Sequence, residues 1–329
     1  MLLNLALLAV GFVLLIKSAD IFVEGSVSIA RILKVPSIVI GLTVVAFGTS
    51  MPEAVVSISA AVGGSTDIAI GNIVGSNIFN LLGVLGLSAL IKPLAVHFKE
   101  IRNDAIISIG AAVALLVVVL VFVNYIPQWI SAGFLAVFLV YLLITVRQAM
   151  RDREKIEEEE EKEEEPPNST KKTKKTNLTK SMPISILLSL VGIALIIGGG
   201  QLTVVNAIDI AYALQISERV IGLTIVAIGT SLPELITSIV AATKGEHDIA
   251  IGNVVGSNIF NILFILGLTG VIMPLSINMS SVVDLGVLIV SSAVFMLFAF
   301  TRRQVGRLEG AAMLAMYVAY LVFIIFLQA

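Results

Sequence analysis

The sequence contains one segment twice, and this repeat constrains the fold more than any other feature. Residues 41–91 align with residues 222–272 at a constant offset of 181 residues, without a gap and with 33 identities in 51 pairs. Both copies contain the blocks Gly-Thr-Ser-x-Pro-Glu and Gly-Asn-x-Val-Gly-Ser-Asn-Ile-Phe-Asn. Such a repeat indicates a fold built from two similar units. We therefore predict two halves, residues 1–148 and 183–329, joined by a charged linker at residues 149–182.

Both halves consist mainly of long apolar runs. Hydrophobic residues make up 57% of the chain and charged residues 13%, and 19 of the 44 charged residues lie between positions 149 and 181. A helix needs about 20 mainly apolar residues to cross a bilayer. The runs therefore predict an all-α membrane protein with ten transmembrane helices, and they exclude an ordinary soluble domain or a nucleic-acid-binding protein. The predicted spans cover approximately residues 3–30, 37–62, 67–91, 104–123, 127–148, 183–213, 219–243, 248–273, 281–300 and 307–328.

The number of spans in each half determines how the repeats are oriented. Five is odd, so the second half enters the membrane from the opposite side and the two five-helix repeats are inverted. Inverted repeats place a binding site near the bilayer midplane. A cytoplasmic linker puts 19 of the 21 Lys and Arg residues on the cytoplasmic side, as the positive-inside rule requires. We therefore predict a multi-pass protein of the cell membrane with both termini outside, and a linker that is a disordered tether from Arg151 to Lys180.

Each repeat places one glutamate in the middle of an apolar span, Glu53 in the second span and Glu234 in the seventh. A carboxylate at that depth costs about 2.5–3.5 kcal/mol on insertion scales, so it normally lines a pathway or has a partner. A protonated glutamate bonded to a neighbouring helix is the alternative, but two repeat-related positions in the same polar block favour a functional role. Pro52 cannot donate to the carbonyl of Gly48, which predicts a helix break beside Glu53.

The third and eighth spans add a polar stripe on one helix face. Its members are Asn72, Ser76 and Asn80 in the first repeat and Asn253, Ser257 and Asn261 in the second. Together with the glutamates these are hard oxygen donors, which suit Ca²⁺ or Na⁺. The chain has no cysteine, and His97 and His247 are predicted in loops or at span ends, so a Zn²⁺ or Cu²⁺ centre among these groups is disfavoured. The glycines at small-xxx-small spacing are interpreted as helix-packing positions: Gly71, Gly75, Gly252 and Gly256.

The doubled blocks resemble the alpha repeats of the cation/Ca²⁺ antiporter superfamily, in particular the prokaryotic Na⁺/Ca²⁺ exchangers. The resemblance implies that Glu53 and Glu234 bind Ca²⁺ together with the carbonyls of Thr49 and Thr230. It further implies alternating access, with the first and sixth spans sliding over a fixed core. The Na⁺ positions that it implies are Ala46, Ser50, Ser76, Ala227, Thr230, Ser231 and Ser257. The central amide positions are Asn80 and Asn261, and an amide at Asn261 disfavours K⁺ dependence.

Four other functions remain to be weighed against Na⁺/Ca²⁺ exchange. A Ca²⁺/H⁺ exchanger would neutralise the two glutamates with protons, whereas paired serines and free carbonyls favour Na⁺. A K⁺-dependent exchanger and a cation channel fit the sequence less well. An intramembrane protease is disfavoured because the HExxH and GxGD motifs are absent. We therefore expect a transporter that is not an enzyme, has no cofactor, and works as a monomer without an obligatory protein partner, interacting with the transported ions and the lipid bilayer.

Overall fold

The computed structural model describes residues 1–123, 125–163, 181–214, 227–277 and 280–327. Apart from four two-residue strands, the described elements are helices, some of them π-helical (η). The first half contains α1 (Leu2–Leu33), α2 (Ser37–Ile40), η1 (Gly41–Val45), α3 (Ala46–Thr49), α4 (Met51–Val62), α5 (Thr66–Phe79), η2 (Asn80–Leu85), α6 (Gly86–Ile91), β1 (Leu94–Ala95), α7 (Phe98–Phe122), β2 (Tyr125–Ile126) and α8 (Gln128–Glu163). The second half contains α9 (Met182–Ala213), α11 (Ala227–Thr230), α12 (Leu232–Lys244), α13 (His247–Ile259), η4 (Phe260–Leu266), α14 (Gly267–Ile272), β3 (Leu275–Ser276), α15 (Ser280–Arg302), β4 (Gln304–Val305) and α16 (Arg307–Leu327).

The described helices account for most of the predicted spans. Eight are long and apolar enough to cross a membrane, and nine if the bent pair Ser37–Thr49 and Met51–Val62 counts as one span. The predicted seventh span, residues 219–243, begins outside the described residues, and α12 covers only its second part. The protein is thus a multi-pass, mainly helical membrane protein, and the full number of ten spans stays a prediction.

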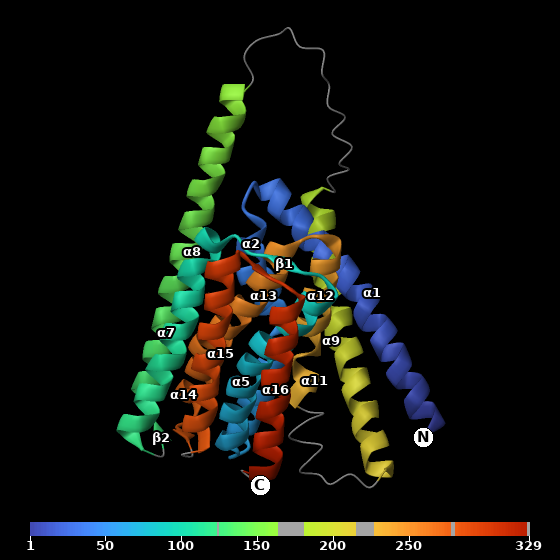
Figure 1. Ribbon diagram of the computed structural model, residues 1–329, viewed down its shortest axis with the longest axis vertical. Coiled ribbons are helices and arrows are strands. Elements are labelled where there is room, and N and C mark those ends of the chain that lie inside the picture. Colours follow the sequence, from blue (N-terminus) through green and yellow to red (C-terminus); the bar gives the residue numbers. More distant parts are fainter. Residues whose placement is uncertain (124, 164–180, 215–226, 278–279, 328–329) are drawn as a thin grey trace.

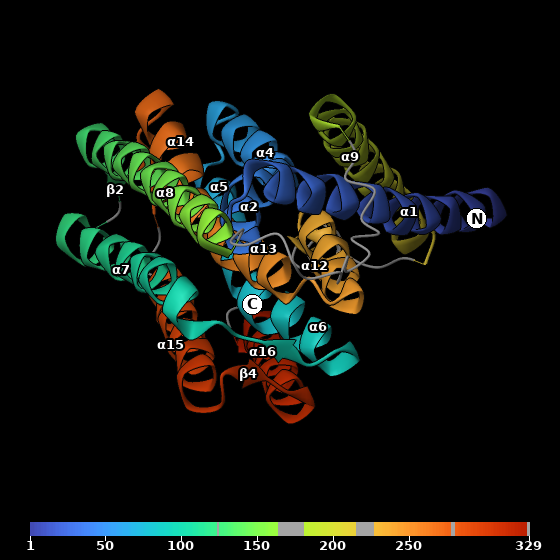
Figure 2. The ribbon, with the colours of Figure 1, turned by 90° about the horizontal axis from the view of Figure 1, so that it is seen from above.

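The repeat segments form the centre of the bundle. The spans that begin with α5 and α13 are the most deeply buried, although their sequences contain many polar residues. Helices α7 and α15 pack together on one side, with α8 against α14 beside them, while α1 and α9 form a separate slanted pair on the other side (Figures 1 and 2). Polar groups therefore lie inside the protein and the apolar outer helices face the lipid, as a bilayer requires.

Helices α1 and α9 pack along each other through glycines. A Cβ atom at Gly192 would lie 2.8 Å from backbone atoms of Phe22, and one at Gly11 would lie 3.0 Å from the backbone nitrogen of Thr203. Any larger residue at these positions would push the two backbones apart. Small residues at a helix crossing are the usual means of close packing in membranes, where dispersion contacts drive association.

The chain ends agree in their placement with an even number of crossings. The start of α1 and the end of α16 lie at one end of the bundle, and α8 projects beyond the opposite end (Figure 1).

Helix α8 continues to Glu163, so the prediction of a disordered linker from Arg151 is wrong for residues 151–163. The reason is composition, because this part is rich in Glu, Lys and Arg, which are strong helix formers. The rest of the predicted tether, residues 164–180, lies outside the described residues.

Two short antiparallel strand pairs connect the halves. Strand β1 pairs with β4, with Leu94 opposite Val305, and β2 pairs with β3, with Tyr125 opposite Ser276. Each pair joins a segment of the first half to a segment of the second half. These strands could not be predicted from the sequence, because two-residue strands carry no periodicity.

Candidate ion-binding site

Each of the two glutamates lies in the first turn of a helix that follows a break. The axis bends by 46° between the segments Ser37–Thr49 and Met51–Val62, and Glu53 is in the first turn of α4. Glu234 occupies the same position in α12, and both side chains are fully buried. The break follows from the sequence, because Pro52 has no N–H for the Gly48 carbonyl. The partial positive charge of a helix N-terminus favours an anionic side chain there.

Each carboxylate is held by a serine of the other repeat. The Ser50 hydroxyl donates to Glu234 Oε1 at 2.8 Å, and the Ser231 hydroxyl donates to Glu53 Oε1 at 2.8 Å. The Glu234 carboxylate also lies close enough to Glu53 to act on it electrostatically. When a two-fold axis relates two copies, a contact from a residue of the first copy to the second is matched by the same contact from the second copy to the first. The structure therefore brings the two predicted acids together in one buried site.

Several buried oxygen atoms at this site have no hydrogen-bond partner among the described residues. They include the second carboxylate oxygen, Oε2, of both glutamates, Oδ1 of Asn80 and Asn261, and the hydroxyl of Ser76. A buried acceptor without a partner costs about 1–3 kcal/mol, so proteins normally satisfy such groups. Here the unsatisfied atoms are carboxylate, amide and hydroxyl oxygens, which are the ligands of hard cations.

Two asparagines that the sequence analysis missed orient the central amides. Asn80 Nδ2 donates to Asn258 Oδ1 at 3.2 Å, and Asn261 Nδ2 donates to Asn77 Oδ1 at 2.9 Å. Asn77 and Asn258 also donate to each other's backbone carbonyls at 3.2 Å. Because the NH₂ groups of Asn80 and Asn261 are used in this way, their oxygen atoms remain free. Both missed residues belong to the duplicated Gly-Ser-Asn-Ile-Phe-Asn block, and that duplication was the available signal.

The outer asparagines of the predicted stripe connect helices, and within the described residues they donate to the backbone carbonyls of the glutamates and not to their carboxylates. Asn72 Nδ2 donates to the Ser57 hydroxyl at 3.0 Å, and Asn72 Oδ1 accepts from the Thr230 hydroxyl at 3.3 Å. The reciprocal contact runs from the Thr49 hydroxyl to Asn253 Oδ1 at 3.0 Å. These bonds join the last residue before each helix break to the opposite repeat, and they hold the Thr49 and Thr230 backbones beside the site.

Comparisons with known proteins agree with this arrangement. Residues 3–147 and 184–326 match the family model described as sodium/calcium exchanger protein. The chain belongs to the sodium/calcium exchanger family. It is 33% identical over 352 residues to the sodium/calcium exchanger MaX1 of Methanosarcina acetivorans, covering 98% of this chain and 99% of that protein. It is 36% identical to the inner membrane protein YrbG of Escherichia coli, covering 100% of this chain and 98% of that protein.

A solved structure of the sodium-calcium exchanger NCX_Mj, soaked with Na⁺ and Ca²⁺, matches the whole fold. Its TM-score is 0.81 at 33% identity, and the match covers 100% of both chains. The predicted membership in a prokaryotic Na⁺/Ca²⁺ exchanger family is therefore confirmed. Because this is a family of ion exchangers, the protein is a cation transporter of the membrane, in agreement with the prediction that it is not an enzyme.

The structure describes three of the four remaining predicted positions, Ser257, Ser76 and Ala46, and it describes only the backbone of Ala227. Ser257 donates weakly to Glu234 Oε1 at 3.4 Å. Its counterpart at the repeat offset, Ser76, is buried, and its hydroxyl has no partner among the described residues. Ala46 is buried one turn before the first helix break. Ala227 begins α11, and its side chain lies outside the described part.

The glycines of the exchanger divide into two groups. A Cβ atom at Gly256 would lie 2.6 Å from the Leu42 carbonyl oxygen, and one at Gly252 would lie 2.9 Å from the Ile38 carbonyl oxygen, so both are packing positions as predicted. For Gly71 and Gly75, no described atom lies within 4 Å of the added Cβ. The repeat counterpart of the segment that meets Gly252 and Gly256 includes residues 222–226, which are outside the described residues.

Proposed function

We propose that this exchanger carries Na⁺ and Ca²⁺ in opposite directions by alternating access. Ca²⁺ is held by Glu53 and Glu234 with the carbonyls of Thr49 and Thr230. Na⁺ occupies the positions around them, which are lined by Ala46, Ser50, Ser76, Ala227, Thr230, Ser231 and Ser257. Asn80 and Asn261 supply the central amide oxygens. One chain contains both halves of this site, so no second copy and no cofactor is required.

The single observation that carries the proposal is the pair of buried glutamates that meet among unsatisfied oxygen atoms. Two ionised carboxylates balance one Ca²⁺, and bidentate binding by both supplies about four of the six to eight oxygens that Ca²⁺ prefers. When the divalent ion leaves, two buried negative charges remain close together, and such a pair is unfavourable without cations or protons. Exchange, in which one cation type replaces the other, follows from that requirement.

The choice between Na⁺ and H⁺ as the counter-ion rests on the surrounding hydroxyls. The Ser50 and Ser231 hydroxyls each donate to one carboxylate oxygen, which supports the ionised form of both acids. The Ser76 hydroxyl and the Asn80 and Asn261 amide oxygens have no partner among the described residues, and a proton on a carboxylate would use none of them. These spare oxygens support Na⁺. Ca²⁺/H⁺ exchange is the alternative function.

Alternating access requires two similar halves of opposite orientation. We propose that the two five-span halves are inverted in the membrane and that both termini are outside, with the end of α8 in the cytoplasm. The reciprocal contacts between the repeats and the placement of the chain ends in Figure 1 support this topology.

The test is Ca²⁺ uptake into proteoliposomes that contain the purified protein. An outward Na⁺ gradient should drive uptake, and an outward H⁺ gradient alone should not. Uptake that follows the pH gradient and ignores Na⁺ would support the Ca²⁺/H⁺ alternative. Rapid uptake without any counter-gradient would show a channel and refute exchange.

Two variants and one matched control test the site itself. Glu53→Gln and Glu234→Gln should each abolish Ca²⁺ transport, because each removes one of the two charges that balance Ca²⁺. Asp104→Asn is the control, since Asp104 is a partly buried acid inside α7 that accepts from the Tyr141 hydroxyl at 2.9 Å, and an amide oxygen can still accept this bond. Near-normal transport by either glutamine variant would refute the two-carboxylate site.

A further inference from the structure

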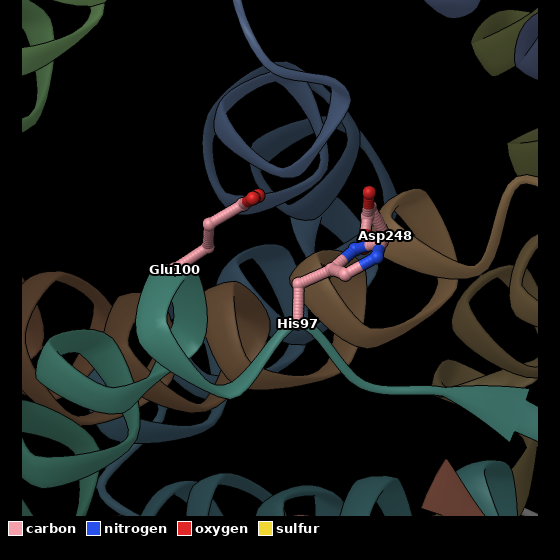
Figure 3. Close-up of side chains that lie close together, drawn as sticks. All are labelled: His97, Glu100 and Asp248. Carbon is pink, nitrogen blue, oxygen red and sulfur yellow. The ribbon is translucent and has the colours of Figure 1, made fainter. Parts of the chain in front are cut away.

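A second group of ligand-type side chains lies far from the glutamates. His97 follows β1, Glu100 is in the first turn of α7, and Asp248 is in the first turn of α13 (Figure 3). One ligand atom from each residue lies within 4.8 Å of the others. Asp248 is about 13 Å along the helix axis from Ser257, the residue that contacts Glu234, at 1.5 Å per residue. The cluster is therefore separate from the proposed transport site.

Hydrogen bonds hold the backbone that carries His97 and Glu100, and a further contact joins His97 to Asp248. The Val96 N–H donates to the Arg303 carbonyl at 2.8 Å and the Glu100 N–H donates to the His97 carbonyl at 2.9 Å. His97 Nδ1 lies 2.9 Å from Asp248 Oδ1. The connection before α7 is thus fixed at both ends, and little ordering would be needed to bring three ligands onto one ion.

The charges in the cluster favour a cation. The Glu100 side chain has no hydrogen bond or ion pair with any residue in the described part of the chain, and Asp248 and Asp152 act on it as further negative charges. The hydrogen bond to Asp248 raises the pKa of His97 above its ordinary value of 6.5. The His97 side chain is 61% exposed, so ions in solution can reach it.

The repeat does not produce an equivalent cluster in the other half of the chain. At the repeat offset of 181 residues, Asp248 corresponds to Asp67, but His97 and Glu100 correspond to Asn278 and Ser281. Only one end of the bundle therefore combines an imidazole with two carboxylates. The cluster lies near the end to which α8 extends, because Asp152 of α8 is close enough to act on Glu100.

We propose that His97, Glu100 and Asp248 form a binding site for a divalent first-row transition metal ion, with Zn²⁺ the best match. One imidazole nitrogen and two carboxylate oxygens are Zn²⁺ ligands, whereas Ca²⁺ and Mg²⁺ prefer oxygen alone. Three protein ligands leave the fourth position of a tetrahedral site to water. Bound Zn²⁺ joins the start of α7 to the start of α13, and hence the outer helices of the first half to the central helix of the second.

The test is calorimetric titration of the full chain with Zn²⁺, after removal of any histidine tag and treatment with a chelator. Excess Ca²⁺ is present throughout to occupy the transport site. We expect one Zn²⁺ per chain, and His97→Gln should weaken binding by about tenfold or more, since loss of even an outer-shell partner often costs that much. His247→Gln is the matched control, because His247 is the other of the two histidines of the chain and stands beside Asp248.

Each outcome decides the proposal. Saturable binding that is lost in His97→Gln and kept in His247→Gln supports it, and binding should also persist in Glu53→Gln. Absence of saturable binding, or equal binding by wild type and His97→Gln, overturns it. If His97→Gln fails to fold, Glu100→Gln replaces it, because this exposed side chain has no bonded partner within the described ranges. The result is independent of the counter-ion used in transport, so the two proposals fail separately.

Discussion

The substitution Asn77→Ala tests whether the central amide oxygens bind the transported ion. In the wild type, the 2.9 Å bond from Asn261 Nδ2 to Asn77 Oδ1 leaves the Asn261 oxygen without a partner among the described residues. Asn77 itself is not one of the proposed ligands. If its side chain is removed, the Asn261 amide loses the bond that distinguishes its oxygen from its nitrogen.

The size of the effect follows from that one bond. A net hydrogen-bond contribution of about 0.5–1.5 kcal/mol corresponds to a factor of about 2–13 in an equilibrium constant. We therefore expect Asn77→Ala to weaken Ca²⁺ affinity by about 2- to 13-fold, because an amide that turns over presents an NH₂ donor to the cation. Asn258→Ala should have the same effect through Asn80, since the contact is reciprocal.

The assay is equilibrium Ca²⁺ binding by the purified variants, with thermal unfolding measured in parallel. Thr269→Ala is the control, because the buried Thr269 hydroxyl donates only to the Ile265 carbonyl within its own helix, at 2.6 Å, and its loss should leave Ca²⁺ affinity unchanged. Asn77→Ala protein that is folded and binds Ca²⁺ with wild-type affinity would refute the role of Asn261 as a ligand.

Three further predictions follow from other contacts. Ser50→Ala and Ser231→Ala should each weaken Ca²⁺ binding by about tenfold, because each loses a charge-assisted hydrogen bond of about 1.5 kcal/mol. Unequal losses of Ca²⁺ affinity in binding assays would argue against a two-fold site. Gly256→Ala should destabilise the protein by about 1–3 kcal/mol through overpacking, seen as a lower Tm, whereas Gly110→Ala, at an exposed position of α7 with no described atom within 4 Å, should not. Zn²⁺ affinity should rise between about pH 6 and about pH 8, because Zn²⁺ must displace the proton of His97, whose pKa is raised. A Zn²⁺ affinity that calorimetric titration finds unchanged over this range would exclude His97 as a ligand.

The features that could be predicted from the sequence are those with a strong local cause. Apolar runs of sufficient length gave the positions of the described spans, and the bend before Glu53 follows from a proline that lacks an N–H. The duplicated glutamates indicated a shared site, and the structure places Glu53 and Glu234 in contact with each other's repeat. In each case the prediction needed only one segment and its copy.

The features that could not be predicted depend on which atom of a side chain faces which helix. Asn72 and Asn80 lie on one helix face, yet the first connects helices and only the second presents a free oxygen. The π-helical segments η2 and η4, which contain Asn80 and Asn261, shift the helix register at this point, and a 3.6-residue period does not reveal them. Such segments occur frequently at functional sites, so their presence beside the central amides adds to the assignment of the site.

The reciprocal contacts also explain why neither repeat could form the site alone. Each glutamate receives its serine hydroxyl from the other repeat, and the amide of Asn261 is oriented by Asn77 of the first repeat. Any displacement of one repeat segment relative to the other would therefore change the hydrogen bonds of both carboxylates together. Such a displacement in an empty site would break these bonds while keeping two buried negative charges, which is costly in a medium of low dielectric constant. Under the proposed exchange, displacement is therefore favoured when cations neutralise the pair, and this coupling of motion to occupancy would distinguish an exchanger from a channel.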